Sequence, residues 1–277
     1  ELTLNTHPLV GNFQWDSEFQ ISWNKNKLIA LNGTASSAIM GYAQWGSTLV
    51  SLSDTGESLY SFYGYVTDGI YQDLADLQTS PKPVKYPANG VFDGANTVYV
   101  GDIKYKDLNG DGVIDTNDRT MIGRGLPIHT GGFTNDFEYK GFDLSIFFQW
   151  SYGNDILNAN RLFFENVNNS RNLNQYASYA NRWTPENPYS DIPVAKNSSS
   201  NKVVSSRVIE DGSFLRLKTL TLGYTLPKKV IKKWGIGNAR VYVAGQNLWT
   251  ISGYSGYDPE VSIRNGALTP GLDYSAY

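Results

Sequence analysis

The chain has 277 residues, of which 40% are hydrophobic and 14% aromatic, and it carries a formal net charge of -3 and no cysteine. The missing cysteines exclude a disulfide framework and any thiolate metal site or nucleophile, and the slightly acidic charge argues against a nucleic-acid-binding face. The 19 tyrosines and 7 tryptophans favour strands, carbohydrate-binding surfaces or membrane interfaces.

The N-terminal region gives the first local signals. Residues 1–10 lack a basic start and an apolar run, so they predict no signal peptide, and no run of 18 apolar residues predicts a transmembrane helix. Residues 13–24 alternate with a period of two, which predicts a strand with one apolar and one polar face. The apolar positions are Phe13, Trp15, Phe19, Ile21 and Trp23, and the polar positions are Gln14, Asp16, Glu18, Gln20, Ser22 and Asn24.

Five further strands follow along the chain. Residues 59–71 predict a strand, although its aromatic residues fall on both faces. Residues 130–150 predict a hairpin, because alternating segments flank a short turn at Lys140-Gly141. Residues 213–226 predict a strand that ends before Pro227, and residues 240–251 predict its neighbour.

The connections between these strands alternate between long and short. The segments 73–129 and 151–206 are long, whereas 140–141 and 227–238 are short. Compact soluble domains rarely hold structureless loops beyond about 12–15 residues. An outer-membrane β-barrel, in contrast, has short turns at one end and long loops at the other. The order therefore favours such a barrel, although residues 28–58 fit it less well.

The long connections have some internal features. Residues 158–166 and 174–183 are helical candidates with polar caps, and the Ser/Asn-rich run 196–206 predicts a mobile loop.

An acidic segment, DLNGDGVIDTND at 107–118, has the spacing of an EF-hand calcium loop. The predicted ligands are Asp107, Asn109, Asp111, Asp115 and Asp118, with the backbone carbonyl of Val113, and Asp118 replaces the usual Glu at the last position. Hard oxygen ligands suit Ca²⁺, which would stiffen an outer loop. The alternative is a turn whose Asp and Asn side chains bond only to their own backbone.

Catalytic motifs are scarce. Neither histidine, His7 or His129, lies in a nucleophile motif, so we expect no Ser–His–Asp chemistry. Carboxylates such as Asp16 and Glu18 could form the acid pair of a glycoside hydrolase. Side chains that are solvated or face the lumen of a barrel explain them more simply. No phosphate-binding glycine motif is present.

A group of lysines stands in the short connection 227–238. Lys228, Lys229, Lys232 and Lys233 surround Val230, Ile231 and Trp234. This group predicts either contact with anionic lipid head groups or a solvated turn with a small apolar anchor.

Several segments together resemble the SusC/RagA-like branch of the TonB-dependent outer-membrane transporters. They occur in the order of that family and span most of the chain from 61 to 261: SFYGYVTDGIYQ (61–72), GDIKYKDLNGDGVIDTNDRTMIG (101–123), YKGFDLSIFFQWSYGNDILN (139–158), RWTPENP (182–188), EDGSFLRLKTLTLGYTLPKK (210–229) and VYVAGQNLWTISGYSGYDPEV (241–261).

The resemblance implies an all-β fold: an antiparallel segment of a transmembrane β-barrel of about 22 strands, with long extracellular loops. It implies an importer of glycans or peptides in the outer membrane of a Gram-negative bacterium, energised by TonB and lidded by a SusD-like lipoprotein. We expect residues 1–277 to be an incomplete C-terminal part of such a barrel, without the plug domain, the signal peptide, the TonB-binding segment and the last strand.

Three functions follow as candidates. For the transporter, the apolar positions of 13–24 face lipid, the polar ones face the lumen, and no residue is catalytic. The main alternative is a soluble extracellular β-sandwich that bears calcium and binds carbohydrate through exposed Trp and Tyr. A glycan-cleaving enzyme ranks third. No residue pattern identifies the cargo or the side chains that contact it.

Overall fold

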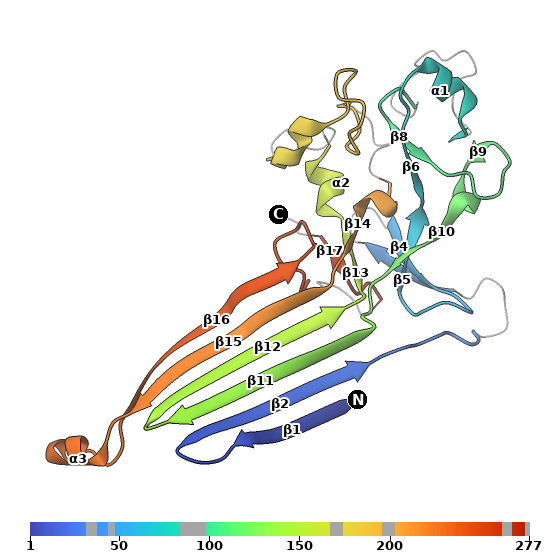
Figure 1. Ribbon diagram of the computed structural model, residues 1–277. Helices are drawn as coiled ribbons and strands as arrows, with labels where there is room; N and C mark the ends of the chain where they lie inside the picture. The colour runs from blue at the N-terminus through green and yellow to red at the C-terminus, as the bar shows by residue number, and fades with distance from the viewer. Residues whose placement is uncertain are drawn as a thin grey trace. The chain divides into compact units, whose positions relative to one another are not determined.

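A computed structural model describes residues 1–31, 38–43, 48–83, 98–166, 174–195, 203–261 and 268–274 (Figure 1). The chain forms two compact units, which are described one at a time. Unit 1 comprises Glu1–Lys25, Pro127–Asn154 and Asp211–Pro259, and unit 2 comprises Asn26–Leu126, Asp155–Glu210 and Glu260–Tyr277. No helix among the described residues is long and apolar enough to cross a membrane.

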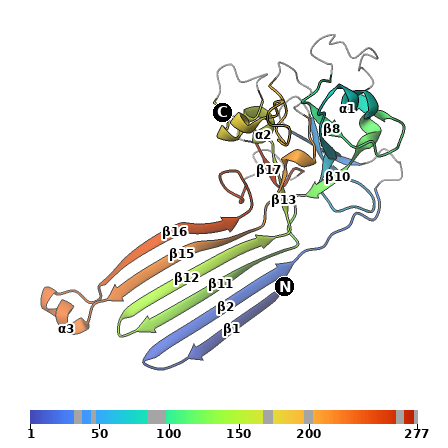
Figure 2. The same cartoon turned by 45° about the horizontal axis from the view of Figure 1, so that its top comes forward.

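Unit 1 is built on a six-stranded antiparallel sheet, whose strands lie side by side in Figures 1 and 2. The order across the sheet is β1 (Leu2–Leu9), β2 (Phe13–Trp23), β11 (His129–Tyr139), β12 (Phe142–Tyr152), β15 (Phe214–Thr225) and β16 (Arg240–Ser252). The short helices α3 (Lys228–Ile231) and η5 (Lys232–Trp234) connect β15 to β16.

The register of this sheet separates two kinds of side chain. Phe19 pairs with Phe133 across β2 and β11, and Phe133 pairs with Phe148 of β12. One residue further along, Glu18 pairs with Thr134. Because side chains alternate between faces, aromatic residues gather on one face of the sheet and polar residues on the other.

Local sequence explains the turns of unit 1. Lys140 and Gly141 both have positive φ, 48° and 88°, which is the backbone that a two-residue hairpin turn requires. Pro227 follows the last residues of β15, where a missing N–H ends the ladder.

The strands predicted in unit 1 are confirmed, and one strand was missed. The segments 13–24, 130–150, 213–226 and 240–251 correspond to β2, the β11–β12 hairpin, β15 and β16. The missed strand is β1, which pairs with β2 through an irregularity between Thr6 and Leu9. The described part of unit 1 contains one sheet, whereas the β-sandwich considered as an alternative needs two sheets packed face to face.

Unit 2 is a mixed unit of small sheets and short helices. Its largest sheet has the order β10 (Arg119–Arg124), β5 (Ser61–Tyr65), β4 (Thr48–Ser53) and β3 (Ile39–Ala43). The other strands are β6 (Thr67–Ile70) with β8 (Ile103–Tyr105), β7 (Lys82–Pro83) with β9 (Val113–Ile114), and β14 (Ile209–Asp211), β13 (Asp155–Asn158) and β17 (Leu272–Asp273) in one sheet. The helices are α1 (Leu74–Thr79), η1 (Thr116–Asp118), α2 (Asn160–Phe164), η2 (Ala177–Asn181) and η4 (Ser206–Val208).

The core of unit 2 draws on residues that are far apart in the sequence. Val50 of β4 and Phe62 of β5 are completely buried, and they pack in one cluster with Leu157, Leu162 and Val208. This cluster is why the segments around 155–166 and 203–210 fold onto the sheet.

One predicted strand in unit 2 needs correction. Residues 59–71 form two strands in different sheets, β5 and β6, rather than one strand. β5 is buried on both faces, so aromatic residues occur at odd and even positions alike. The alternation of apolar and polar residues that marks a half-exposed strand is therefore absent.

The long connections carry their own secondary structure. The segment 73–129 contains α1 and β7 to β10, and the helical candidate 158–166 contains α2. The candidate 174–183 forms only the 3-10 turn η2. The polar run 196–206 lies mostly outside the described residues, since 196–202 are not among them.

Candidate functional site

The aromatic face of the unit 1 sheet is a continuous apolar surface. Trp15 stacks on Phe137 with ring centroids 5.8 Å apart, and Phe19 stacks on Trp150 at 5.6 Å. The same face continues over β15 and β16, where large apolar side chains are exposed: Leu215, Leu222, Val241, Val243, Trp249 and Ile251. A soluble monomer rarely exposes an apolar surface of this extent.

The indole N–H groups of Trp15 and Trp150 both have partners within this face. Trp15 Nε1 donates to Asn135 Oδ1 at 3.0 Å, and Trp150 Nε1 donates to His129 Nδ1 at 3.1 Å. Gly131 makes room for the Trp150 ring, since any Cβ at this position would collide with it. The polar atoms of Trp15 and Trp150 are therefore satisfied without water, as an apolar solvent requires.

The opposite face of the sheet is polar and hollowed. A hollow of about 570 Å³ is lined by side chains of β2, β11 and β12, among them Gln20, Thr130 and Gln149. Phe147 is an aromatic residue on this face, and its ring lies over Gly132, where a Cβ would be 2.9 Å from the ring edge. This face offers hydroxyl and amide groups to a polar ligand or to water.

An ion pair crosses one strand on the polar face. Arg240 Nε at the start of β16 donates to Asp143 Oδ1 of β12 at 2.9 Å, and Arg240 Nη2 donates to Asp143 Oδ2. The strand between them is β15, and its residue opposite Asp143 is Gly223. Any Cβ on Gly223 would collide with both charged groups. The glycine therefore lets the pair join β12 to β16.

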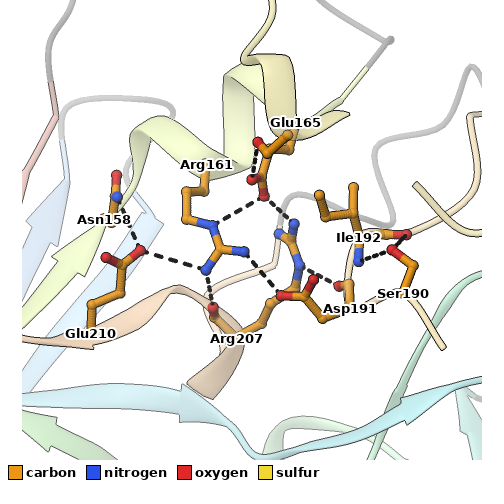
Figure 3. A network of polar contacts seen from close by, with 9 residues as sticks. Asn158, Arg161, Glu165, Ser190, Asp191, Ile192, Arg207 and Glu210 are labelled. Carbon is orange, nitrogen blue, oxygen red and sulfur yellow. Dashed lines mark hydrogen bonds and ion pairs between the residues drawn. The ribbon is translucent and has the colours of Figure 1, made fainter. Parts of the chain in front are cut away.

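Unit 2 contains a buried ionic network centred on Glu165 (Figure 3). Glu165 Oε2 accepts hydrogen bonds from Arg161 Nε at 3.1 Å and from Arg207 Nη2, while Oε1 accepts from the Ser178 hydroxyl at 2.9 Å. The side chains of Glu165 and Arg207 are only 3% and 4% exposed. The network therefore joins the short helices α2, η2 and η4 to one another.

Two further carboxylates complete this network. Arg161 donates to Asp191 Oδ2 at 3.0 Å and to Glu210 Oε1 at 3.5 Å, and Arg207 Nε donates to the Asp191 carbonyl at 2.8 Å. Burial alone would lower the pKa of Arg161, but Glu165, Asp191 and Glu210 raise it above its ordinary value. Burial dominates at Arg207 and lowers its pKa. The carboxylates therefore offset the loss of hydration that burial imposes on these two guanidinium groups.

The acidic loop 107–118 has the hydrogen bonds of a series of Asx turns. Asp107 accepts from the backbone N–H groups of Gly110 and Gly112, both at 2.7 Å. Asn109 accepts from Asp111 N at 3.0 Å, and Asp111 accepts from Val113 N at 2.8 Å. Asp115 accepts from Asn117 N at 2.7 Å.

Asp118 closes the acidic loop from inside. Its side chain is completely buried, and its two oxygens accept from Leu108 N at 2.9 Å and Asp115 N at 2.8 Å. In the part of the chain that the structure describes, no three His, Asp or Glu side chains converge on a point where a metal ion fits. The oxygen ligands suit Ca²⁺, but they bond to the backbone here, so calcium binding stays a prediction.

The remaining sequence candidates do not form a catalytic group. His7 is paired with Asp16, and Glu18 accepts a hydrogen bond from Gln20. His129 accepts from the Trp150 indole on the apolar face. Sequence reasoning missed Asn135 and the Glu165 network. Arg161 lies on α2 and Glu165 is its C-cap, and this spacing of four residues is a local signal that could have indicated the pair.

Comparison with known proteins matches the whole chain to one group of receptors. TonB-dependent receptor P3 of Formosa agariphila is 35% identical over 100% of this chain and 27% of its own length. TonB-dependent receptor P26 of the same organism is 37% identical over 96% of the chain and 26% of its length. TonB-dependent receptor SusC of Bacteroides thetaiotaomicron is 27% identical over 94% of the chain and 24% of its length. No family model matches the chain.

Solved structures give the same result for the fold. The RagAB peptide transporter superposes with a TM-score of 0.70 at 23% identity, over 97% of this chain and 27% of the transporter chain. The open-open state of the RagAB peptide importer gives 0.67 at 24% identity, over 97% and 26%. These likenesses confirm the predicted fold class, an antiparallel segment of a transmembrane β-barrel.

The chain spans about a quarter of the length of the curated relatives that it matches. Over its whole length it is homologous to a portion of the SusC/RagA-like TonB-dependent receptors, which confirms the resemblance found in the sequence.

Proposed function

We propose that this chain forms part of the wall of a TonB-dependent nutrient importer in the outer membrane of a Gram-negative bacterium. The observation that carries the proposal is the two-faced sheet of unit 1. Its apolar face would contact lipid hydrocarbon and its polar face the lumen, as in membrane barrels.

The dimensions of the strands support this placement. The strands β2, β11 and β12 each have 11 residues. At about 3.3 Å per residue such a strand is roughly 36 Å long, and a tilt of about 40° reduces its height to roughly 28 Å. The outward apolar band of an outer-membrane barrel is about 25 Å tall, so each strand is long enough to cross it.

We further propose glycans or peptides as cargo, and TonB and a SusD-like surface lipoprotein as partners. The names of the relatives support the TonB requirement, and one structural relative is a peptide transporter. Cargo selection would lie in unit 2, which contains most of the residues that connect β2 to β11 and β12 to β15. Transport of this kind is mechanical, so no catalytic residue is proposed.

The test uses the intact receptor that contains this chain, expressed in its bacterium with and without a functional TonB. We expect the receptor to fractionate with the outer membrane and to require detergent for extraction. Cells should take up labelled oligosaccharides or oligopeptides only when TonB is present. Extraction as a detergent-free monomer, or equal uptake without TonB, would contradict the proposal. The class of labelled cargo that competes for uptake assigns the substrate.

A further inference from the structure

The connection between β15 and β16 is the most basic short segment of unit 1. Four lysines occur at positions 228, 229, 232 and 233, and no acidic residue occurs from 226 to 239. All four lysines are exposed. The segment therefore presents a concentrated positive charge at the end of the sheet that carries the short turns.

This segment is also amphipathic, with one residue holding it in place. Ile231 is 1% exposed and anchors the turn, whereas Trp234 is 67%, Val230 45% and Ile236 43% exposed. Gly235 ends η5 with a φ of 68°, and Ile236 N then donates to the Ile231 carbonyl at 3.3 Å. The compact turn thus displays a tryptophan and two aliphatic side chains among its lysines.

An aromatic row places this turn relative to the proposed membrane. Phe13, Tyr139, Phe142 and Tyr224 lie opposite one another in register across four strands, at the end of the apolar face nearest the short turns. Phe142 and Tyr224 have ring centroids 4.4 Å apart, and Phe13 and Tyr139 6.2 Å. Rows of aromatic residues mark the level where the hydrocarbon ends and the head groups begin.

The turn follows directly after this row. β15 ends at Thr225, one residue beyond Tyr224, and α3 begins at Lys228. Both views draw α3 beyond the ends of β15 and β16 (Figures 1 and 2). The lysines therefore lie at the depth of lipid phosphates if the sheet spans the membrane as proposed above.

We propose that residues 228–236 bind the head groups of anionic phospholipids, an inference that rests on the proposed membrane placement. The lysines would contact the phosphates, while Trp234, Val230 and Ile236 insert at the boundary with the acyl chains. A basic amphipathic segment with an exposed Trp has this mode of binding. Each lysine near an anionic surface contributes about a fivefold preference, which salt weakens.

The experiment measures quenching of Trp234 in the intact receptor by brominated lipids. The receptor is reconstituted in vesicles of phosphatidylcholine and phosphatidylglycerol, of which one or the other is brominated. The Trp234 signal is the difference between the parent and Trp234→Phe. We expect brominated phosphatidylglycerol to occupy the site at least tenfold more strongly than brominated phosphatidylcholine, and salt to reduce this ratio.

Lysine variants connect the preference to the charge. Replacing Lys228, Lys229, Lys232 and Lys233 by Gln should reduce the ratio to near one. Replacing Lys25 and Lys27, two exposed lysines that follow β2, by Gln is the matched control and should leave the ratio unchanged. Equal quenching by both lipids in the parent, or an unchanged ratio in the quadruple variant, would overturn the inference.

A second tryptophan separates failure of this inference from failure of the proposed function. Trp249 lies on the apolar face, 51% exposed and paired with Leu217. Its signal, obtained from Trp249→Phe, should be quenched by either brominated lipid if the sheet is embedded. Quenching of Trp249 without lipid selectivity at Trp234 overturns only the head-group site. Absence of quenching at both positions overturns the membrane placement as well.

Discussion

Trp15 and Asn135 are 120 residues apart in the sequence, yet the indole Nε1 of Trp15 donates to Asn135 Oδ1 at 3.0 Å on the apolar face of the sheet. Asn135 is only 7% exposed, so its amide stands among apolar neighbours. Asn135→Ala should lower the free energy of unfolding by about 1–3 kcal/mol, because it leaves the indole N–H without an acceptor. Urea unfolding of the reconstituted receptor measures this loss.

A double-mutant cycle tests whether the hydrogen bond causes the effect. Trp15→Phe removes the donor and keeps an aromatic ring against Phe137. The cost of Asn135→Ala should be smaller in the Trp15→Phe background, with a coupling energy of about 1 kcal/mol. Strict additivity of Trp15→Phe and Asn135→Ala would show that Asn135 acts only through packing.

Charge placed on opposite faces of β11 should have opposite consequences. Phe133 lies near the middle of the strand on the apolar face, and Thr134 is its neighbour on the polar face. Phe133→Arg should cost about 2–4 kcal/mol, because arginine is placed near the midplane of the hydrocarbon. Thr134→Arg should change stability little. Trp15→Arg should cost less than Phe133→Arg, since Trp15 lies near the turn end of β2.

Comparison of folded yields after refolding into vesicles measures the ranking of these three arginine variants. A silent Phe133→Arg together with a disruptive Thr134→Arg would reverse the assignment of the lipid-facing and lumen-facing sides.

The Glu165–Arg207 pair should be the most sensitive point of unit 2. Both side chains are almost completely buried, and Arg161 shares the same carboxylate. Glu165→Gln should destabilise this unit by about 3–5 kcal/mol, because it leaves buried guanidinium charge without its partner. Protease sensitivity of the segment 174–195 reports the loss.

Two variants support the Glu165 test. Glu186→Gln changes an exposed carboxylate in the same segment and should have no effect. Glu165→Leu combined with Arg207→Met should be more stable than Glu165→Gln, because it removes both members of the buried pair. Equal stability of Glu165→Gln and Glu186→Gln would exclude the network as a structural anchor.

Calcium binding at residues 107–118 is decided by titration of the chelator-treated receptor, with Mg²⁺ as the control ion. If the loop holds Ca²⁺, the parent binds it and Asp111→Asn binds it more weakly. Asp111→Asn is informative because an Asn can keep the turn bond to Val113 N while losing the charge. If addition of Ca²⁺ gives the same signal with the parent receptor as with a chelator-containing blank, the loop does not bind Ca²⁺ and is a series of Asx turns only.

The same loop should respond to acid. The backbone N–H of Gly112, followed by that of Gly110, holds the pKa of Asp107 below its ordinary value of 3.8. A lowered folded-state pKa contributes stability that is present above pH 3.8 and is lost as the pH falls through the folded value. Pepsin should therefore cut the loop faster in Asp107→Asn than in the parent at pH values above 3.8. The difference should shrink at lower pH, and a difference that grows on acidification would contradict the bonding described.

The sequence predicted the membrane strands well because their signal is local. Alternation along 13–24 and the Lys140-Gly141 turn each depend on neighbouring residues, and β2 and β11–β12 follow from them. β1 was missed because its pairing is interrupted near Thr6 and its polar residues weaken the alternation. The prediction of a single strand at 59–71 was wrong because β5 is buried on both faces, so its sequence lacks the period of two that defines the bounds of a half-exposed strand.

The contacts that matter most were beyond local reasoning. Glu165, Arg207 and Asp191 meet only after the chain has folded back on itself, and nothing in the local sequence around these three residues indicates that they are partners. The Trp15–Asn135 bond likewise depends on the register of two strands. For the acidic loop, the motif identified the residues, and the structure placed their oxygens on backbone N–H groups.

The bridge from Asp143 over Gly223 to Arg240 has a consequence for assembly of the sheet. The pair forms only when three strands have docked in the correct register, since a slip of β15 by one residue would put a bulky neighbour of Gly223 under the two charges. The ion pair therefore stabilises the native register of β12, β15 and β16 and disfavours the register in which β15 is shifted by one residue. A partly exposed ion pair of this kind contributes little to the stability of the finished sheet, but it favours the native register over the nearest shifted one.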